Sequence, residues 1–265
     1  ASFAQSARTA ARTTYNSFER HRLEFLATGL ADAVAFRVAA DRKLYRNISD
    51  KNLLCRYGDL TAYLALEDHD GKIDINNAGG ILLRAGFRAG GASEQNAETL
   101  QQYAEAYRSG QALPAGIPDI SSLPSLKGAA FERVEEIYDA IAAMKLPAVD
   151  LTRIFTVYRK SGNVEFETAP LALQQQLRDD PATKEFTAAD NGTFELVDVI
   201  VALVTRNGLK AGAKKTYHGA ADGRLQIVAR DYGISKNVVE RLANGSADGE
   251  CTRLLGLKPG VVDGA

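Results

Sequence analysis

Three aspartates stand close together in the stretch EDHDGKIDINNAGGILL, residues 67–83, where they could bind a metal ion. Asp68, Asp70 and Asp74 surround Gly71, and carboxylate oxygens are preferred ligands of calcium. The EF-hand calcium loop has glycine at position 6 and side-chain ligands that include positions 1 and 12. With Gly71 at position 6, position 1 falls on leucine and position 12 on asparagine, so both end ligands are wrong.

A tight turn between two strands accounts better for the same stretch. Residues 60–66 are consistent with a strand, and residues 72–75 alternate between apolar and polar side chains. An Asp-Gly pair between two such runs is a strong hairpin signal, because both turn residues need positive φ. We therefore predict a hairpin with its turn at Asp70-Gly71 and keep Asp68, Asp70 and Asp74 as a secondary candidate for calcium.

Other residues that support chemistry are sparse. The three histidines, His21, His69 and His218, belong to no short metal-binding motif. No phosphate-binding glycine loop or nucleophile elbow occurs, so the sequence predicts a protein that is not an enzyme. Cys55 and Cys251 match neither zinc nor CxxC spacing. On spacing alone, a long-range disulfide and two separate buried thiols both remain open.

The composition is that of an ordinary globular protein. The chain has 265 residues, of which 45% are hydrophobic and 25% charged, and its net charge is −1. This is enough for one large domain or two smaller ones. A near-neutral chain lacks the basic surface of a general nucleic-acid binder. It contains neither an apolar run of about 18 residues nor a signal peptide.

One long helix is predicted at the start of the chain. Residues 2–45 contain no proline and only Gly29 among glycines, and their apolar residues recur near helical spacing. A helix of about 40 residues would span roughly 60 Å. The sequence is weakly apolar before Phe18 and amphipathic after it, so we expect the second half to pack and the first half to project. The chain begins at Ala1 without an initiator methionine, and we expect that a preceding segment has been removed.

Strands and helices follow one another in blocks along the rest of the chain. Helices are predicted at residues 79–85, ended by Gly86, at 96–109, capped by Asn96 and ended by Gly110, at 126–144, and from Ala169-Pro170 to residue 177. Strands are predicted at 52–77, 154–158, 163–166, 195–205, 215–218 and 224–230, with turns at Asn207-Gly208 and Asp222-Gly223. A helical block between parts of a sheet favours an α+β fold.

A weak internal repeat raises a second interpretation. INNAGGILLRAG (75–86) and EFETAPLALQQQL (165–177) both place a polar–Ala pair before a short apolar helix, and LPSLKG (123–128) is a related fragment. Helix-hairpin-helix modules bind nucleic-acid phosphates through closely spaced glycines with basic support. Here Gly128 is a single glycine near Glu132, Glu135 and Glu136. We interpret these helices as a packing module and keep nucleic-acid binding as an alternative.

Several segments, in their order and spacing, resemble one known family. They are the helix ASFAQSARTAARTTYNSFERHRLEFLATGLADAVAFRVA, then DHDGKIDINNAGGILL, IPDISSLPSLKG, RIFTVYRKSGNVEFETAPLALQQQL and LKAGAKK…GRLQIVARDYG. Together they resemble the minor pseudopilin of type II secretion systems, general secretion pathway protein K. The resemblance covers residues 1–233 and leaves the tail unmatched.

The resemblance implies a fold and a role. The fold is α+β and pilin-like, with a long N-terminal helix packed on an antiparallel sheet and an inserted all-helical domain. The expected boundaries are 1–77 for the helix and first strands, 78–151 for the inserted helical domain, 152–233 for the rest of the helical block and the closing strands, and 234–265 for the tail. The implied role is non-enzymatic: the protein sits at the tip of the pseudopilus and promotes its assembly and the export of folded proteins.

The resemblance also implies a location and partners. Family members are anchored in the bacterial inner membrane with their soluble part in the periplasm, and the anchoring segment would be absent from this chain. The expected partners are other minor pseudopilins, through the long helix and pilin-like domain, and the inner-membrane secretion platform, with no nucleic acid. Candidate subunit contacts are the apolar residues of the projecting half, Phe3, Ala7, Tyr15 and Phe18.

Two further expectations concern calcium and the cysteines. Calcium binding is associated with the family, but its acidic, tryptophan-containing loop is replaced here by QQYAEAYRSGQALPAGIPDI. This counts against calcium in the helical domain and leaves Asp68, Asp70 and Asp74 as candidates, so a calcium-dependent docking or adhesion module stays a further alternative. A periplasmic location favours a disulfide between Cys55 and Cys251, which would tie the tail to the first strand region.

Overall fold

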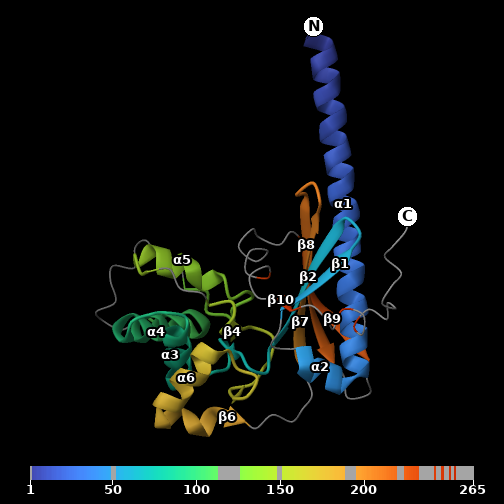
Figure 1. Ribbon diagram of the computed structural model, residues 1–265. Coiled ribbons are helices and arrows are strands. Elements are labelled where there is room, and N and C mark those ends of the chain that lie inside the picture. Colours follow the sequence, from blue (N-terminus) through green and yellow to red (C-terminus); the bar gives the residue numbers. More distant parts are fainter. Residues whose placement is uncertain are drawn as a thin grey trace. The chain divides into compact units, whose positions relative to one another are not determined.

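The chain forms two compact units (Figure 1). Unit 1 consists of Ala1–Glu67 and Val197–Ala265, and unit 2 of Asp68–Leu196. The computed structural model describes residues 2–48, 52–112, 126–147, 151–188, 195–219 and 224–232, together with Leu242, Ser246–Ala247, Cys251 and Leu254. Unit 2 is continuous in sequence, whereas unit 1 is built from both ends of the chain.

Unit 1 begins with the predicted long helix. Helix α1 spans Ser2–Ala40, and the short helix α2 spans Arg42–Ile48. The break falls at Asp41, whose carboxylate Oδ1 accepts a 3.0 Å hydrogen bond from the backbone N–H of Leu44. This is the geometry of a helix N-cap, which competes with continuation of the preceding helix. The predicted helix is therefore confirmed as far as residue 40.

Only the second half of α1 is buried. Residues 4–18, in the first half, are exposed. In Figure 1 this first half extends beyond the strands of the sheet. Burial begins at Leu23 and continues along one face with Ala27, Ala31, Val34, Ala35 and Val38. These spacings of three and four residues align the side chains on one side of the helix. The predicted division into a projecting half and a packed half is thus observed.

In the part of unit 1 that the structure describes, the sheet has six strands in the order β10-β1-β2-β7-β8-β9. Their bounds are β1 Asn52–Tyr57, β2 Leu60–Asp68, β7 Leu196–Thr205, β8 Lys210–Gly219, β9 Leu225–Tyr232 and β10 Ser246–Ala247. Strands β1 and β2 pair antiparallel, as do β8 and β9, whereas β10 pairs parallel with β1. Helix α1 packs against β8 and β9. The expected α+β arrangement of a long helix on an antiparallel sheet is confirmed.

Among the described residues, a glycine lies in each of two tight turns of this sheet. Gly58, between β1 and β2, has φ of 56°, and Gly208, between β7 and β8, has φ of 79°. The N–H of Gly208 donates a 2.9 Å hydrogen bond to the carbonyl oxygen of Thr205. The turn predicted at Asn207-Gly208 is confirmed, and the one predicted at Asp222-Gly223 lies outside the described residues. Left-handed backbone at both sites favours glycine.

Unit 2 packs its helices around one apolar core. The helices are α3 (Gly80–Ala89), α4 (Glu94–Ser109), α5 (Glu136–Ala143) and α6 (Leu171–Asp179), with the 3-10 helix η2 (Pro181–Phe186). The core contains Phe87, Tyr103, Phe131 and Phe155, with the Phe87 and Phe155 ring centroids 4.8 Å apart. Residues 126–135, which were predicted as helix, precede α5.

The resemblance implied an all-helical inserted domain, but unit 2 also contains short strands. Strand β3 (Ile73–Asp74) pairs parallel with β4 (Phe155–Thr156), and β5 (Val164–Glu165) pairs parallel with β6 (Thr187–Ala188). The compact unit also extends well beyond the predicted domain of residues 78–151 in both directions. The reason is that β3 takes its partner from a segment far along the chain, which local periodicity does not reveal.

The hairpin predicted at Asp70-Gly71 is wrong. Strand β2 pairs with β1, and the residues after Gly71 pair with β4 instead of folding back on β2. Gly71 is needed for a different reason, because a Cβ built on it would lie 2.1 Å from the carbonyl oxygen of Thr168. Glycine is thus required at this position by the close approach of two backbone segments and not by a tight turn. Within the predicted strands 154–158 and 163–166, Phe155–Thr156 pairs with β3 and Val164–Glu165 with Thr187–Ala188.

Two predicted helix limits also change. Gly86 lies inside α3, where a Cβ would come within 2.5 Å of the Phe155 ring, so it permits helix packing instead of ending the helix. The N-cap of α4 is Ser93, whose hydroxyl accepts a 3.3 Å hydrogen bond from the N–H of Asn96. Gly110 ends α4 with φ of 70°, as predicted.

Candidate interaction surface

Helix α1 carries apolar side chains on two opposite faces. One face, described above, is buried against the sheet. The other carries Phe18, Phe25 and Phe36, which are 65%, 78% and 69% exposed. These phenylalanines are separated by seven and eleven residues, close to two and three turns of helix. At 100° per residue this face lies roughly 180° from the stripe of Leu23, Ala27 and Val34.

We call Phe18, Phe25 and Phe36, with Tyr15 and Leu26 beside them, the exposed aromatic face. Tyr15 is 65% exposed and Leu26 is 45% exposed. Single exposed apolar residues are normal, but a row of large ones along one helix marks a surface that binds another molecule. The exposed aromatic face is therefore the strongest candidate interaction surface in the described chain.

The predicted contact residues fall partly on this face. Tyr15 and Phe18 belong to it, and Ala7 is exposed on the same side, two turns or more before them. The backbone of Phe3 is part of α1, but its side chain lies outside the described residues. Phe25 and Phe36 lie on the same face but were not among the predicted contact residues. The signal that could have found them is their spacing from Phe18, which sets them apart from the buried stripe.

Two threonines in the projecting half of α1 form hydrogen bonds within the helix. The hydroxyl of Thr9 donates to the carbonyl oxygen of Gln5, and that of Thr13 donates to the carbonyl oxygen of Thr9, each at 3.0 Å. Arg22 pairs with Glu19 at 3.2 Å on the helix surface. Exposed pairs of this kind add little stability. These contacts are all made within α1 itself.

A polar cluster joins the packed half of α1 to the sheet. Asp32 Oδ1 on α1 accepts hydrogen bonds of 2.7 Å from Lys215 Nζ and from the Tyr217 hydroxyl, both on β8. Lys215 and Tyr217 are two residues apart and so point to the same face of the strand. Burial acts to raise the pKa of Asp32, but the hydrogen bonds from Lys215 and Tyr217 outweigh it, and the pKa lies below its usual value. Burial, together with Asp32, raises the pKa of Tyr217.

The intervening residues of β8 form a second cluster on the opposite face of the sheet. The hydroxyl of Thr216 donates a 2.7 Å hydrogen bond to Asp198 Oδ1 on β7, and Lys214 Nζ lies 2.8 Å from Asp198 Oδ2. Burial acts to lower the pKa of Lys214, but the charges of Asp198 and Glu67 outweigh it and raise the pKa. Both clusters are ion pairs that join β8 to a neighbouring element, α1 in the first and β7 in the second.

Two of the three aspartates of the opening stretch, Asp70 and Asp74, bind other parts of unit 2, and Asp68 binds within the stretch. Asp70 Oδ1 lies 3.1 Å from Arg159 Nε, and Asp70 Oδ2 accepts a 2.8 Å hydrogen bond from the N–H of Glu195. Burial raises the pKa of Asp70, while the N–H of Glu195 and the charge of Arg159 oppose the shift. Asp74 Oδ2 accepts from the N–H of Lys160 at 2.7 Å. Asp68 Oδ1 accepts from the N–H of Asp70 at 2.8 Å.

In these contacts the carboxylates hold loop segments of unit 2 together through hydrogen bonds and an ion pair. Within the described ranges, no three His, Cys, Asp or Glu residues gather closely enough to hold a metal ion. The structure therefore gives calcium no assembled ligand set at Asp68, Asp70 and Asp74. A buried carboxylate that is already paired with arginine gains less from a cation than a free one does.

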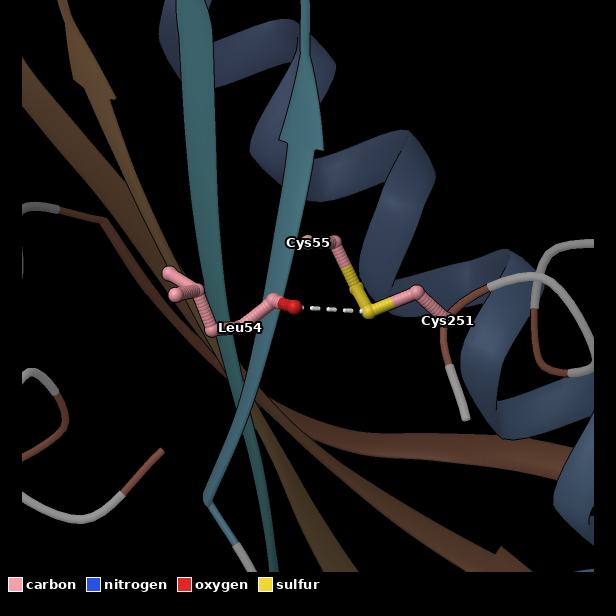
Figure 2. Close-up of a disulfide and its surroundings, with 3 residues drawn as sticks. All are labelled: Leu54, Cys55 and Cys251. Carbon is pink, nitrogen blue, oxygen red and sulfur yellow. Dashed lines mark hydrogen bonds between the residues drawn. A yellow bond between two sulfur atoms is a disulfide. The ribbon is translucent and has the colours of Figure 1, made fainter. Parts of the chain in front are cut away.

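Figure 2 shows Cys55 and Cys251 joined by a disulfide in unit 1. The sulfur atoms are 2.04 Å apart and the Cα atoms 5.6 Å apart, across 196 positions of sequence. Cys251 Sγ also lies 3.0 Å from the carbonyl oxygen of Leu54, the contact dashed in Figure 2. A disulfide sulfur has no hydrogen to donate, so this is a close sulfur–oxygen contact. It places Cys251 beside strand β1.

The fragment that suggested nucleic-acid binding has little free positive charge. Lys127 Nζ lies 3.0 Å from Glu132 Oε1 and 3.5 Å from Glu136 Oε2. Glu136 Oε1 also accepts hydrogen bonds from the N–H groups of Glu132 and Arg133, so the carboxylate occupies the amides that a phosphate would need. This neighbourhood lies just before α5 and includes its first residue, Glu136.

The histidines do not converge on one site. His21 on α1 lies 3.1 Å from Glu24, His69 Nδ1 lies 2.7 Å from the Thr156 hydroxyl, and His218 belongs to β8. A nucleophile, a base and an orienting group within hydrogen-bond reach are the signature of covalent catalysis. The described side chains give no positive evidence of such a set around these three residues.

A long N-terminal helix on an antiparallel sheet, with a second compact unit between strands β2 and β7 in sequence, defines an α+β protein of the pilin-like class. Among solved structures, the crystal structure of the GspK-GspI-GspJ complex from the enterotoxigenic Escherichia coli Type 2 Secretion System contains a similar chain. The alignment has a TM-score of 0.58 and 9% sequence identity, and it covers 86% of this chain and 100% of the other. At this identity the likeness shows the fold.

Sequence comparisons add no relative. No family model matches the chain, and no curated protein matches it. In the described part of the chain, no helix has both the length and the apolar character required to cross a bilayer.

Proposed function

We propose that this chain is the periplasmic part of a minor pseudopilin that packs through α1 against other pilin-like subunits. It acts at the tip of a type II secretion pseudopilus, where it promotes pseudopilus assembly and the export of folded proteins. The observation that carries the proposal is the exposed aromatic face of α1. The pilin-like fold supports it, because the similar solved chain comes from a complex named for three secretion-system proteins.

The energetics favour a helix as the partner. Burying one phenylalanine side chain contributes roughly 1.5–3 kcal/mol, so covering three of them supplies a large part of a stable association. The phenylalanines form a row along a helix that projects beyond its own sheet, and a neighbouring helix can follow such a row by ridge-into-groove packing. The partner we propose is therefore the long helix of another minor pseudopilin.

The proposal extends to location and anchoring. An inner-membrane anchor preceding α1 would place the chain on the periplasmic side and bring it near the secretion platform. A disulfide between Cys55 and Cys251 suits an oxidising compartment of this kind. The role is one of assembly and requires no catalytic group.

A matched pair of substitutions tests the proposal. Phe18→Asp adds one carboxylate to the exposed aromatic face, and Asn16→Asp adds one carboxylate two residues away on a different face. Both positions are exposed, so neither change should unfold unit 1. We expect Phe18→Asp to reduce copurification with co-expressed minor pseudopilins at least tenfold, and Asn16→Asp to leave it near wild type. Equal copurification of both variants, with circular dichroism unchanged, refutes packing through this face.

A further inference from the structure

Gly29 interrupts the row of phenylalanines on the exposed aromatic face. It lies inside α1 and is exposed to solvent. At 100° per residue, its position around the helix differs by about 20° from those of Phe18 and Phe36. Phe25 precedes it by four residues and Phe36 follows it by seven. The face therefore has a position without a side chain between two aromatic rings.

The described part of the chain gives no internal reason for glycine at position 29. Gly29 does not have the positive φ that favours this residue type, and no described atom lies within 4 Å of a Cβ built on it. Gly86 inside α3 differs, because a Cβ there would come within 2.5 Å of the Phe155 ring. Glycine weakens the interior of a helix more than any residue except proline. At position 29 it therefore lowers the stability of α1 without a packing gain in the described chain.

We propose that Gly29 is the position where the partner helix approaches α1 most closely, and that a large apolar side chain of that helix packs onto it. This inference rests on the proposed function, in which the partner is the long helix of another minor pseudopilin. Because glycine has no Cβ, a neighbouring helix can come nearer to the backbone here than at any other residue type. The incoming side chain contacts the rings of Phe25 and Phe36 on either side of Gly29.

The size of the exposed aromatic face suits one long helix. Its four aromatic side chains are between 65% and 78% exposed, and a fully covered aromatic side chain buries roughly 150–250 Å². Together they offer roughly 400–700 Å², against about 800 Å² per partner in a standard protein interface. Phe18 and Phe36 are 18 residues apart, which is five full turns or roughly 27 Å of helix. A single helix of similar length covers the whole row, with Gly29 in its second half.

The charged groups next to this face favour an apolar side chain on the partner. Arg22 lies 3.2 Å from Glu19 on the same helix, and Asp32 Oδ1 lies 2.7 Å from Lys215 Nζ of β8. Both groups already have an oppositely charged neighbour within the chain. A charged side chain placed over Gly29 would lose water between aromatic rings and gain no new ion pair. A leucine, isoleucine or phenylalanine of the partner has no such cost.

Two substitutions of increasing size at position 29 test the inference. Gly29→Ala adds one methyl group, and Gly29→Leu fills the space assigned to the partner's side chain. Alanine favours a helix over glycine, so Gly29→Ala should raise the melting temperature of the isolated chain by about 2–4 °C. Copurification with the co-expressed minor pseudopilins should change in the opposite direction. We expect it to fall about threefold for Gly29→Ala and at least about tenfold for Gly29→Leu, because added bulk separates the two helices.

Asn16→Leu is the matched control for Gly29→Leu. It introduces the same side chain at another exposed position of α1, about 140° away around the helix. We expect its copurification to stay near wild type, with the circular dichroism of both variants unchanged. An equal loss for the two variants overturns the inference, because leucine would then interfere wherever it is placed. Unchanged copurification of Gly29→Leu overturns it as well.

Phe18→Asp, measured in the same experiment, separates this inference from the proposed function. If Phe18→Asp loses copurification while Gly29→Leu keeps it, the face binds its partner but the closest approach is not at Gly29, and only the inference fails. If both variants keep it, the proposed function fails too. Sedimentation of the isolated chain checks the identity of the partner. A wild-type dimer that Gly29→Leu converts to a monomer would mean that a second copy of this chain packs at Gly29, which overturns the assignment to another pseudopilin.

Discussion

Lys215 Nζ donates a 2.7 Å hydrogen bond to Asp32 Oδ1, so a buried lysine of β8 is paired with a carboxylate of α1. The Lys215 side chain is 2% exposed and that of Asp32 is 49% exposed. Burying an ammonium group without a partner is costly, whereas a half-exposed carboxylate retains part of its hydration. The pair therefore fixes where α1 lies along β8 more than it adds net stability.

Removing the carboxylate should destabilise unit 1. Asp32→Ala leaves the Lys215 ammonium buried without its carboxylate, and we expect a loss of about 1–3 kcal/mol in urea-induced unfolding. Adding Lys215→Met to the same chain should restore most of the loss. The control is Asp59→Ala, which breaks the exposed pair with Arg206 at 3.6 Å and should cause no measurable change. A double variant as unstable as Asp32→Ala contradicts the account.

The same pair should make stability depend on pH. Asp32 has a lowered pKa in the folded chain, so its contribution is present above its unfolded pKa of about 3.9 and is lost as the pH falls through the folded pKa. Asp32→Asn should therefore be less stable than wild type near neutral pH, with the difference shrinking below about pH 4. Urea unfolding at a series of pH values measures this. A difference independent of pH would show that charge on Asp32 is not involved.

Gly71→Ala should be strongly destabilising. The added Cβ would meet the carbonyl oxygen of Thr168 at 2.1 Å, and a backbone atom cannot move aside as a side chain does. We expect a loss of about 2–4 kcal/mol. Gly79→Ala is the matched control, because nothing lies within 4 Å of a Cβ built there. If thermal denaturation shows equal midpoints for the two variants, the close approach of Gly71 to Thr168 is wrong.

Changes on the exposed aromatic face should leave the isolated chain intact. Phe36→Ser removes an aromatic ring that is 69% exposed, and we expect its unfolding free energy to stay within about 0.5 kcal/mol of wild type. Phe87→Ser, in the core of unit 2, is the contrasting variant and should lose at least about 3 kcal/mol. A large loss for Phe36→Ser would mean that its ring is covered within the monomer.

Asp70 should act through Arg159 and not through calcium. Asp70→Asn removes the charge that pairs with buried Arg159, so we expect a lower melting temperature. The decrease should be the same in excess calcium and in chelator, because the carboxylate is already engaged. A decrease seen only with calcium would restore Asp68, Asp70 and Asp74 as a ligand set.

Local patterns predicted the elements of this chain better than their partners. The proline-free start of the chain predicted α1, and glycine at position 208 predicted the β7–β8 turn. Both predictions succeeded because helices and tight turns depend on residues that are neighbours in sequence. The pairing of β3 with β4 and the need for Gly71 beside Thr168 depend on segments far apart in sequence. Asp-Gly was therefore assigned to a hairpin that does not exist.

The candidate surface was predicted in part for a related reason. Tyr15 and Phe18 lie where the helix projects, so their exposure followed from the weakly apolar sequence around them. Phe25 and Phe36 lie in the half that packs, and periodicity marks apolar positions without telling which of two opposite faces the sheet covers. Lys215 was assigned to a strand, and its burial depends on Asp32, which lies on another element.

The two opposite apolar faces of α1 have a consequence for how substitutions are tolerated. An ordinary surface helix has one sensitive side, so a scan of substitutions along it shows one maximum of damage per turn. In the packed half of α1, residues such as Leu23 and Phe25 alternate between the sheet side and the outer side. If α1 packs on another subunit as proposed, a scan scored by copurification with that subunit should show two maxima per turn, and a scan scored by folding of the isolated chain only one.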